Sequence, residues 1–95
     1  DAIVAFNDII TFAAFNAIRE AGLRIPDDVA LIGFTDDVHA AYVTPQMSAI
    51  VDQAHQMGAT ACQLLLKNIA GDTGVYHKIV PQQLVIRGTS AKKPQ

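Results

Sequence analysis

The chain has 95 residues, of which 51% are hydrophobic and 17% charged, with a formal net charge of -2. This composition is typical of one small globular domain and excludes a disordered or fibrous chain. A surface that grips nucleic acid unaided is usually basic, so these residues are not expected to hold DNA by themselves. The single cysteine excludes an internal disulfide, and no apolar run approaches the length of a membrane span.

The first third of the chain predicts a strand, a helix and a second strand. The run 2–6 is apolar without alternation, which favours a strand buried on both faces of a parallel sheet. A helix is expected from Ile9 to about Ala21, with Asp8 as its N-cap and Gly22 as the left-handed residue after its end. A second apolar run, 29–34, completes a βαβ unit.

The helix predicted after the first strand has an unusual distribution of apolar residues. Only Thr11, Asn16, Arg19 and Glu20 are polar between Ile9 and Ala21, so apolar side chains cover most of its circumference. A surface helix normally carries a single apolar stripe. We therefore expect this helix to be covered twice, by its own sheet and by a partner.

The remaining elements are shorter or less regular. The pattern predicts a short helical segment at 38–43, a strand at 47–51 and a second long helix from about Gln53 to Ala70. The segment 76–87 is interpreted as two short strands around Pro81, and 91–95 as a flexible tail after a domain that ends at residue 90. The predicted fold class is therefore α/β, built on a parallel sheet.

Polar side chains follow the first two predicted strands. Asn7 and Asp8 end the first, and Thr35, Asp36 and Asp37 end the second. Ligands of open parallel sheets bind beyond the carboxyl ends of the strands, and short polar side chains there suit a polar or hydroxyl-rich molecule. The alternative is that the aspartates only cap the following helices, and for Asp8 the cap is favoured.

Catalytic and metal-binding patterns are not evident. The three histidines lie far apart, without metal-ligand spacing to Cys, Asp or Glu, and no nucleophile elbow or phosphate loop is visible. The adjacent aspartates are explained by turns and caps. We therefore expect no enzyme activity, no metal and no cofactor.

Five sequence blocks, in this order and spacing, carry a specific resemblance. They are D-A-I-V-A-F-N-D, A-I-R-E-A-G-L-R-I-P-D-D-V-A-L-I-G-F, A-A-Y-V-T-P, Q-M-G-A-T-A-C-Q-L-L-L and L-V-I-R-G-T-S. The chain resembles the C-terminal part of the LacI/GalR family of bacterial transcription regulators, from Asp1 to about Ser90. The resemblance implies the last part of a periplasmic-binding-protein-like (type I) effector core, with operator DNA contacted only through an N-terminal domain that lies outside this chain.

The resemblance also implies an effector site. Asn7 matches a polar residue that faces the effector, and Thr35 stands where the family typically has an aspartate, with Asp36 next to it. A hydroxyl cannot make the bidentate contact of a carboxylate, so the effector need not be one of the usual sugars or purines. Asp52 falls where a cleft-facing glutamine is common. It either accepts from a sugar hydroxyl or caps the helix expected at Gln53.

A homodimer is the other implication. Phe12, Asn16, Tyr42 and Val43 match the surface through which these regulators pair side by side, although ordinary core packing is the alternative for Phe12 and Tyr42. The resemblance implies a cytoplasmic protein with a small-molecule effector, most simply a sugar, whose binding shifts the population of subdomain orientations. The competing interpretation is a periplasmic sugar-binding protein of a transport system, which shares the core fold.

Overall fold

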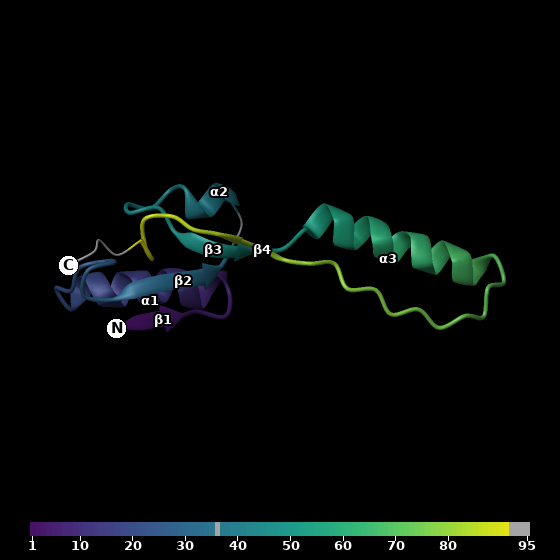
Figure 1. Ribbon diagram of the computed structural model, residues 1–95, viewed down its shortest axis with the longest axis horizontal. Helices are drawn as coiled ribbons and strands as arrows, with labels where there is room; N and C mark the ends of the chain where they lie inside the picture. Colours follow the sequence, from purple (N-terminus) through teal and green to yellow (C-terminus); the bar gives the residue numbers. More distant parts are fainter. Residues whose placement is uncertain (36, 92–95) are drawn as a thin grey trace. The chain divides into compact units, whose positions relative to one another are not determined.

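The computed structural model of the chain describes residues 1–35 and 37–91. The chain forms two units. Unit 1 comprises Asp1–Asp52 and Gln83–Gln95, and unit 2 comprises Gln53–Gln82. Figure 1 labels the elements of both. The chain thus leaves unit 1 after residue 52 and returns to it at residue 83.

The described residues of unit 1 form a four-stranded sheet and two helices, which Figure 1 labels. The strands lie side by side in the order of the sequence, namely β1 (Ala2–Val4), β2 (Ala30–Phe34), β3 (Ser48–Val51) and β4 (Gln83–Val85). The first three are parallel, as the sequence predicts, and β4 runs antiparallel to β3. The α/β expectation is therefore confirmed, with the difference that the sheet is mixed.

Helix α1 (Asp8–Glu20) connects β1 to β2, and its start differs from the sequence prediction. Its N-cap is Asn7, whose Oδ1 accepts from the Ile10 amide at 2.9 Å, whereas Asp8 is the first helical residue. Asn7 has extended backbone angles that suit a cap, and a carboxamide oxygen serves that position as well as a carboxylate does. The helix ends as expected, with Gly22 directly after its C-cap Ala21 and in a left-handed conformation, φ of 74°.

Strand β1 lies at the edge of the sheet, which overturns the expectation that residues 2–6 are buried on both faces. Val4 is 68% exposed and Phe6 79%, and only Ala5 of this run is buried. A continuous apolar run indicates what a strand can bury. What it does bury depends on its neighbours, and β1 pairs on one side with β2.

The core of unit 1 lies on the face of the sheet that α1 covers. An ideal Cβ on Gly33 of β2 would overlap the side chain of Thr11, so the helix packs almost directly on the strand backbone. Short helix α2 (Asp37–Ala40) contributes Ala40 to the same cluster. The buried apolar cluster consists of Ala5, Phe15, Ile18, Leu31, Ala40, Met47 and Ala49.

The segment after β4 is hydrogen-bonded to the amino ends of β2 and β3. Thr89 is fully buried, accepts from the Ser48 amide at 2.8 Å through its Oγ1 and donates to the Leu31 carbonyl at 2.7 Å. Its own carbonyl accepts from the Leu31 amide at 2.9 Å. The pairing of β2 with β3 begins at Ile32 and Ser48. Thr89 thus joins the two parallel strands at their amino ends, where this pairing begins.

Unit 2 consists of helix α3 (Ala54–Ile69) and the segment that returns to β4. The helix spans the expected residues, but the strand predicted before Pro81 does not form, and β4 is the only strand of that tail among the described residues. No residue of α3 is buried. The turn after the helix is ordered by Asp72, which accepts from the Gly74 amide at 2.8 Å and from the Tyr76 hydroxyl at 2.5 Å.

These hydrogen bonds shift two pKa values in unit 2. The hydroxyl of Tyr76 and the Gly74 amide stabilise the carboxylate and lower the pKa of Asp72. The same bond raises the pKa of Tyr76, since it is lost when the phenol ionises. Lys67 lies over the Tyr76 ring, 5.4 Å from its centroid. These contacts hold the return segment against the end of α3.

Candidate functional site

The residues that follow the three parallel strands lie at the same edge of the sheet. Val4 pairs with Ile32, and Phe34 with Ile50. Continuing the first register by three residues places Asn7 beside Thr35, and continuing the second places Val51 beside Thr35. The Phe6 and Phe34 rings, 6.4 Å apart between centroids, support the first extension. We call this region the carboxyl edge: residues 6–7, 34–35 and 51–52.

Asn7 is exposed at the carboxyl edge and fixed in position there. Its Oδ1 is engaged in capping α1, and its carbonyl accepts from the Thr11 hydroxyl at 2.6 Å and from the Thr11 amide at 2.8 Å. The capping interpretation, favoured from sequence for Asp8, therefore applies to Asn7. The cap leaves the Nδ2 of the carboxamide as the group that can donate to a bound molecule.

Thr35 lies next to Asn7 but is only 6% exposed. Its Oγ1 is buried and has no hydrogen-bond partner. A buried hydroxyl without a partner costs free energy, on the order of 1–3 kcal/mol, and such a group is uncommon in native structures. The neighbouring Asp36, also expected at the site, lies outside the described residues.

Asp52 is exposed and stands at the point where the chain leaves unit 1. The alternative role considered for it was a cap of the following helix. The N-cap of α3 is Gln53, and α3 begins at Ala54. The carboxylate of Asp52 therefore follows β3 at the carboxyl edge, one residue before the N-cap. Together, the structure brings Asn7, Thr35 and Asp52 to this edge.

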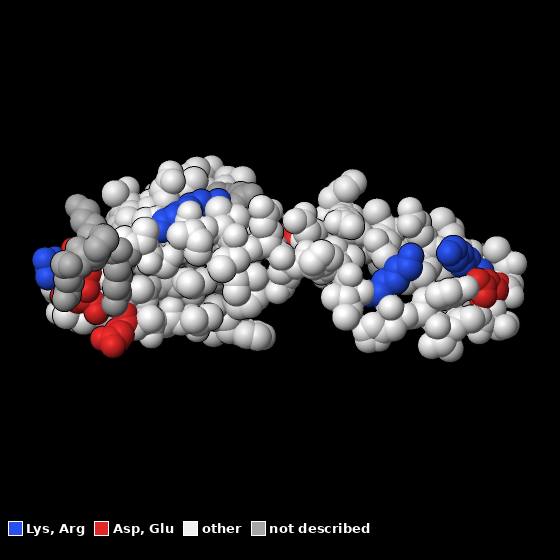
Figure 2. All heavy atoms as spheres, in the orientation of Figure 1, with Lys and Arg blue, Asp and Glu red and all other residues white. Residues whose placement is uncertain are grey.

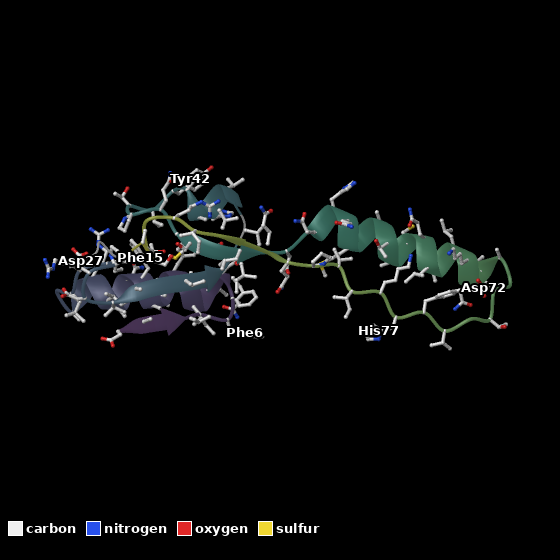
Figure 3. The ribbon with its side chains drawn as sticks, in the orientation of Figure 1. Phe6, Phe15, Asp27, Tyr42, Asp72 and His77 are labelled. Atoms are coloured by element: carbon white, nitrogen blue, oxygen red, sulfur yellow. The ribbon has the colours of Figure 1, made fainter. Side chains whose placement is uncertain are left out.

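The four residues expected at a dimer interface fall into two groups. Phe12 of α1 and Val43 are partly buried and pack against the core cluster, as the core-packing alternative requires for Phe12. Asn16 is exposed, and Tyr42 is 74% exposed, so core packing does not describe Tyr42. In Figure 3, Tyr42 lies at the surface of unit 1. Phe15 of α1, by contrast, is buried in the core cluster.

Sequence reasoning missed the polar cluster that fixes the amino ends of the strands. Ser48 Oγ lies 2.6 Å from Ser90 Oγ and 2.7 Å from the Arg87 amide, and Arg87 Nη1 donates to the Met47 carbonyl at 2.9 Å. The R-G-T-S block, residues 87–90, contributed to the family resemblance, but no structural role was predicted for it. A run of hydroxyl residues after a final strand was the available signal, because such residues are buried only with hydrogen-bond partners.

The described residues contain neither a metal-binding cluster nor a membrane-spanning helix. In residues 1–35 and 37–91, no three His, Cys, Asp or Glu side chains come together to hold an ion. Over the same residues no helix is both long and apolar enough to cross a bilayer. The visible face of unit 1 carries few charged side chains (Figure 2).

Comparison with known proteins identifies this arrangement. The family profile described as "Periplasmic binding protein-like domain" matches residues 1–90. The lactose operon repressor of Rhizobium radiobacter is 38% identical over 94 residues, which are 99% of this chain and 82% of the repressor. The chain therefore belongs to the periplasmic-binding-protein-like family.

Solved structures narrow the class. The transcriptional regulator CelR in complex with cellobiose matches 95% of this chain with a TM-score of 0.84 and 31% identity. A LacI family regulator from Enterococcus faecium with bound ribose matches 98% with a TM-score of 0.84 and 26% identity. The chain spans 28% and 35% of those two chains. It is a part of the effector-binding domain of a LacI-type transcriptional regulator, which confirms the resemblance found from the sequence.

Proposed function

We propose that this chain binds a neutral, hydroxyl-rich effector, a sugar, at the carboxyl edge of unit 1. The observation that carries the proposal is the alignment of Asn7, Thr35 and Asp52 at the ends of three adjacent parallel strands. Polar groups in this place are the usual means by which an open α/β sheet holds a ligand. The cellobiose and ribose bound to the two structural relatives support a sugar as the class of ligand.

The donors and acceptors at the edge suit sugar hydroxyl groups. Asn7 offers the two N–H groups of its Nδ2, and the carboxylate of Asp52 accepts. Thr35 both donates and accepts, once a small movement of its side chain or of its neighbours exposes the hydroxyl. Asp36 is proposed as a further acceptor, on the family correspondence alone. A ligand that hydrogen-bonds to the Thr35 hydroxyl would supply the partner that this group lacks. The new hydrogen bond would favour the bound conformation.

The charges of unit 1 favour a neutral effector over a phosphorylated one. Its Lys and Arg side chains, among the described residues, are Arg19, Arg24 and Arg87. Arg19 lies in the last turn of α1, whose first turn is at the carboxyl edge. Arg87 is bound to the carbonyl of Met47, before β3 begins. A phosphate at the edge would therefore meet carboxylates, without an arginine or lysine from the described residues of this unit to bind it.

We further propose that the chain forms a homodimer through α1 and the segment after α2. Asn16 and Tyr42 supply its exposed contacts, with Phe12 and Val43 beneath them. Operator DNA would be contacted by parts of the protein outside this chain, and effector binding would shift the population of two dimer geometries. This assigns the chain a regulatory role in the cytoplasm and no enzymatic one. A transport protein is the less favoured alternative, because the relatives described above are regulators.

Thermal unfolding with candidate sugars tests the effector site. Cellobiose, lactose and ribose are added separately, and the one that binds raises the melting temperature because it binds only the folded state. The variant Asn7→Asp keeps a capping oxygen but removes the Nδ2 donor, and Asp52→Asn removes the acceptor charge. We expect each to weaken binding about tenfold, equivalent to the loss of one hydrogen bond to a charged or oriented group.

The matched control is Asp27→Asn, which alters a carboxylate that precedes β2 and so lies away from the carboxyl edge. It should leave the sugar affinity unchanged. A sugar that binds Asn7→Asp and Asp52→Asn as tightly as it binds the native chain would refute the site. No shift with any of the three sugars would refute the proposal that the chain binds a sugar of this kind.

A further inference from the structure

The carboxyl edge carries polar groups at two depths. Asn7 and Asp52 are exposed there, whereas Thr35 is only 6% exposed and its Oγ1 is buried. Thr35 follows β2, which is the middle one of the three parallel strands because it pairs with β1 on one side and with β3 on the other. A recessed hydroxyl therefore stands between two exposed side chains that can hydrogen-bond.

The Thr35 hydroxyl differs from those of the two other buried threonines in the described part of the chain. Thr11 donates to the Asn7 carbonyl at 2.6 Å, and Thr89 donates to the Leu31 carbonyl at 2.7 Å. Over residues 1–35 and 37–91, Thr35 Oγ1 is the one buried side-chain oxygen or nitrogen without a partner. An unpaired hydroxyl is unfavourable where a valine would fill the same space. Its position at the carboxyl edge indicates that a bound molecule supplies the partner.

The depth of this hydroxyl restricts which group of a sugar can reach it. The ring hydroxyls of a pyranose are attached directly to the ring, and the ring would meet the exposed Asn7 and Asp52 first. A primary hydroxyl on an exocyclic carbon stands one carbon–carbon bond farther out, about 1.5 Å, and rotates about that bond. It also donates and accepts, as the threonine hydroxyl does. The hydroxymethyl group of a hexopyranose therefore has the reach and the hydrogen-bonding chemistry that the recess requires.

Resting on the proposed sugar site, we propose that Thr35 makes this site specific for a hexopyranose, whose exocyclic hydroxymethyl group enters the recess. The hydroxyl of that group hydrogen-bonds to Thr35 Oγ1, while the ring hydroxyls bond to the Asn7 Nδ2 and to the Asp52 carboxylate. The recess also selects a neutral group. A carboxylate or phosphate on the exocyclic carbon would be buried there without a Lys or Arg from the described residues of unit 1 to balance its charge, which is costly.

Matched sugars measure this specificity on the intact regulator, by isothermal titration calorimetry. D-Glucose is compared with 6-deoxy-D-glucose, which lacks only the exocyclic hydroxyl, and D-galactose with 6-deoxy-D-galactose. For the hexose that binds, the 6-deoxy form should bind about tenfold more weakly, because it leaves the Thr35 hydroxyl unpaired. The corresponding uronate, which has a carboxylate on the same carbon, should bind more weakly still.

Substitutions at position 35 assign the preference to the threonine hydroxyl. Thr35→Val removes the hydroxyl and keeps the shape, so this variant should bind the hexose and its 6-deoxy form with equal affinity. Thr35→Ser keeps the hydroxyl and should keep the preference. Because the hydroxyl has no partner in the free protein, Thr35→Val should not lower the melting temperature without sugar. Thr44→Val is the matched control, since Thr44 is exposed and precedes the amino end of β3, and it should leave both affinities unchanged.

The outcomes separate this inference from sugar binding itself. A protein that binds none of these sugars, and none of cellobiose, lactose and ribose, refutes the proposed function together with the inference. Equal binding of a hexose and its 6-deoxy form by the native protein, or tighter binding of the uronate or of ribose, overturns the inference while the sugar site stands. A preference that survives in Thr35→Val belongs to another residue and also overturns it. A lower melting temperature of Thr35→Val without sugar does so too, because the hydroxyl would then have a partner in the free protein.

Discussion

Unit 1 and unit 2 differ in what their apolar side chains contact. In unit 1, Leu31, Met47 and Ala49 are fully buried between the sheet and its helices. In unit 2, α3 has regularly spaced apolar residues but buries none of them, and Leu65 and Ile69 are 59% and 73% exposed. The same helical periodicity therefore accompanies two different degrees of burial. Periodicity reports what a helix can cover, and only the neighbouring elements determine whether it is covered.

The sharpest test of this difference is the same substitution in both units. Gly33→Ala adds a methyl group that would overlap the side chain of Thr11, which is itself fully buried, so α1 must move off the sheet. We expect a loss of about 2–3 kcal/mol in the free energy of unfolding, as for other overpacked cores. Gly58→Ala in α3 meets nothing within 4 Å and should stabilise the helix by about 0.5–1 kcal/mol.

Urea denaturation followed by circular dichroism measures both. Equal effects of the two substitutions would show that the units do not differ as their packing implies. A loss at position 58 in particular would indicate that α3 has a close neighbour at that point.

The next largest effect is expected at the bridge between β2 and β3. Thr89→Val keeps the shape of the side chain but removes the acceptor for the Ser48 amide and the donor to the Leu31 carbonyl. Leaving two buried backbone groups unpaired should cost about 2–4 kcal/mol together, at about 1–2 kcal/mol each. Thr73→Val, in the exposed turn of unit 2, is the control and should change stability little. A neutral Thr89→Val would mean that water or another group replaces the bridge.

A smaller effect is expected at the start of α1. Asn7→Ala removes the oxygen that accepts from the Ile10 amide and should destabilise unit 1 by about 1 kcal/mol. Asn7→Asp should retain most of that stability, since a carboxylate also accepts there and interacts favourably with the helix N-terminus. The free energy of unfolding of the two variants, compared with the native chain, checks this. No loss in Asn7→Ala would show that the cap contributes nothing, and equal losses in both variants would show that a carboxylate does not replace it.

The smallest effect concerns the turn of unit 2 and depends on pH. The pKa of Asp72 is lowered on folding, so its hydrogen bonds stabilise the turn above the ordinary range of an aspartate and are lost as the pH falls through the lowered pKa. The pKa of Tyr76 is raised, so its contribution is present below the ordinary tyrosine range and is lost as the pH rises through the raised value.

Absorbance titration of the phenol measures this coupling. A Tyr42→Phe background leaves Tyr76 as the only tyrosine. In that background, Asp72→Asn should return the pKa of Tyr76 toward its ordinary value, because the charged acceptor is gone. An unchanged titration would show that the two side chains are not hydrogen-bonded in solution.

The elements that sequence predicted well are those with local causes. The end of α1 at Gly22 follows from the left-handed φ that glycine accepts, and the Leu23 amide bonds back to the Ile18 carbonyl as this ending requires. The parallel order of the first three strands follows from the βαβ pattern. For the site, the placement of Asn7 and Thr35 at one edge was predictable for the same reason.

The features that sequence did not predict depend on residues far apart in the chain. The burial of Thr35 and the exposure of Phe6 depend on which elements cover each end of the sheet. The hydrogen bonds of Thr89 join it to Leu31, 58 positions earlier. The choice of Asn7 over Asp8 as the cap is different in kind, because both side chains can accept and only the local backbone geometry decides between them.

The pairing of Val51 with Gln83 means that the ends of unit 2 are attached to neighbouring positions on two antiparallel strands. Adjacent antiparallel strands can be joined by a loop of two residues such as Asn-Gly. Unit 2 is thus an insertion into a β-hairpin. Replacement of residues 52–82 by such a two-residue loop would leave Val51 paired with Gln83 and keep every strand of the sheet in register. Unit 2 could therefore be removed at this junction without disrupting the sheet that carries Asn7 and Thr35.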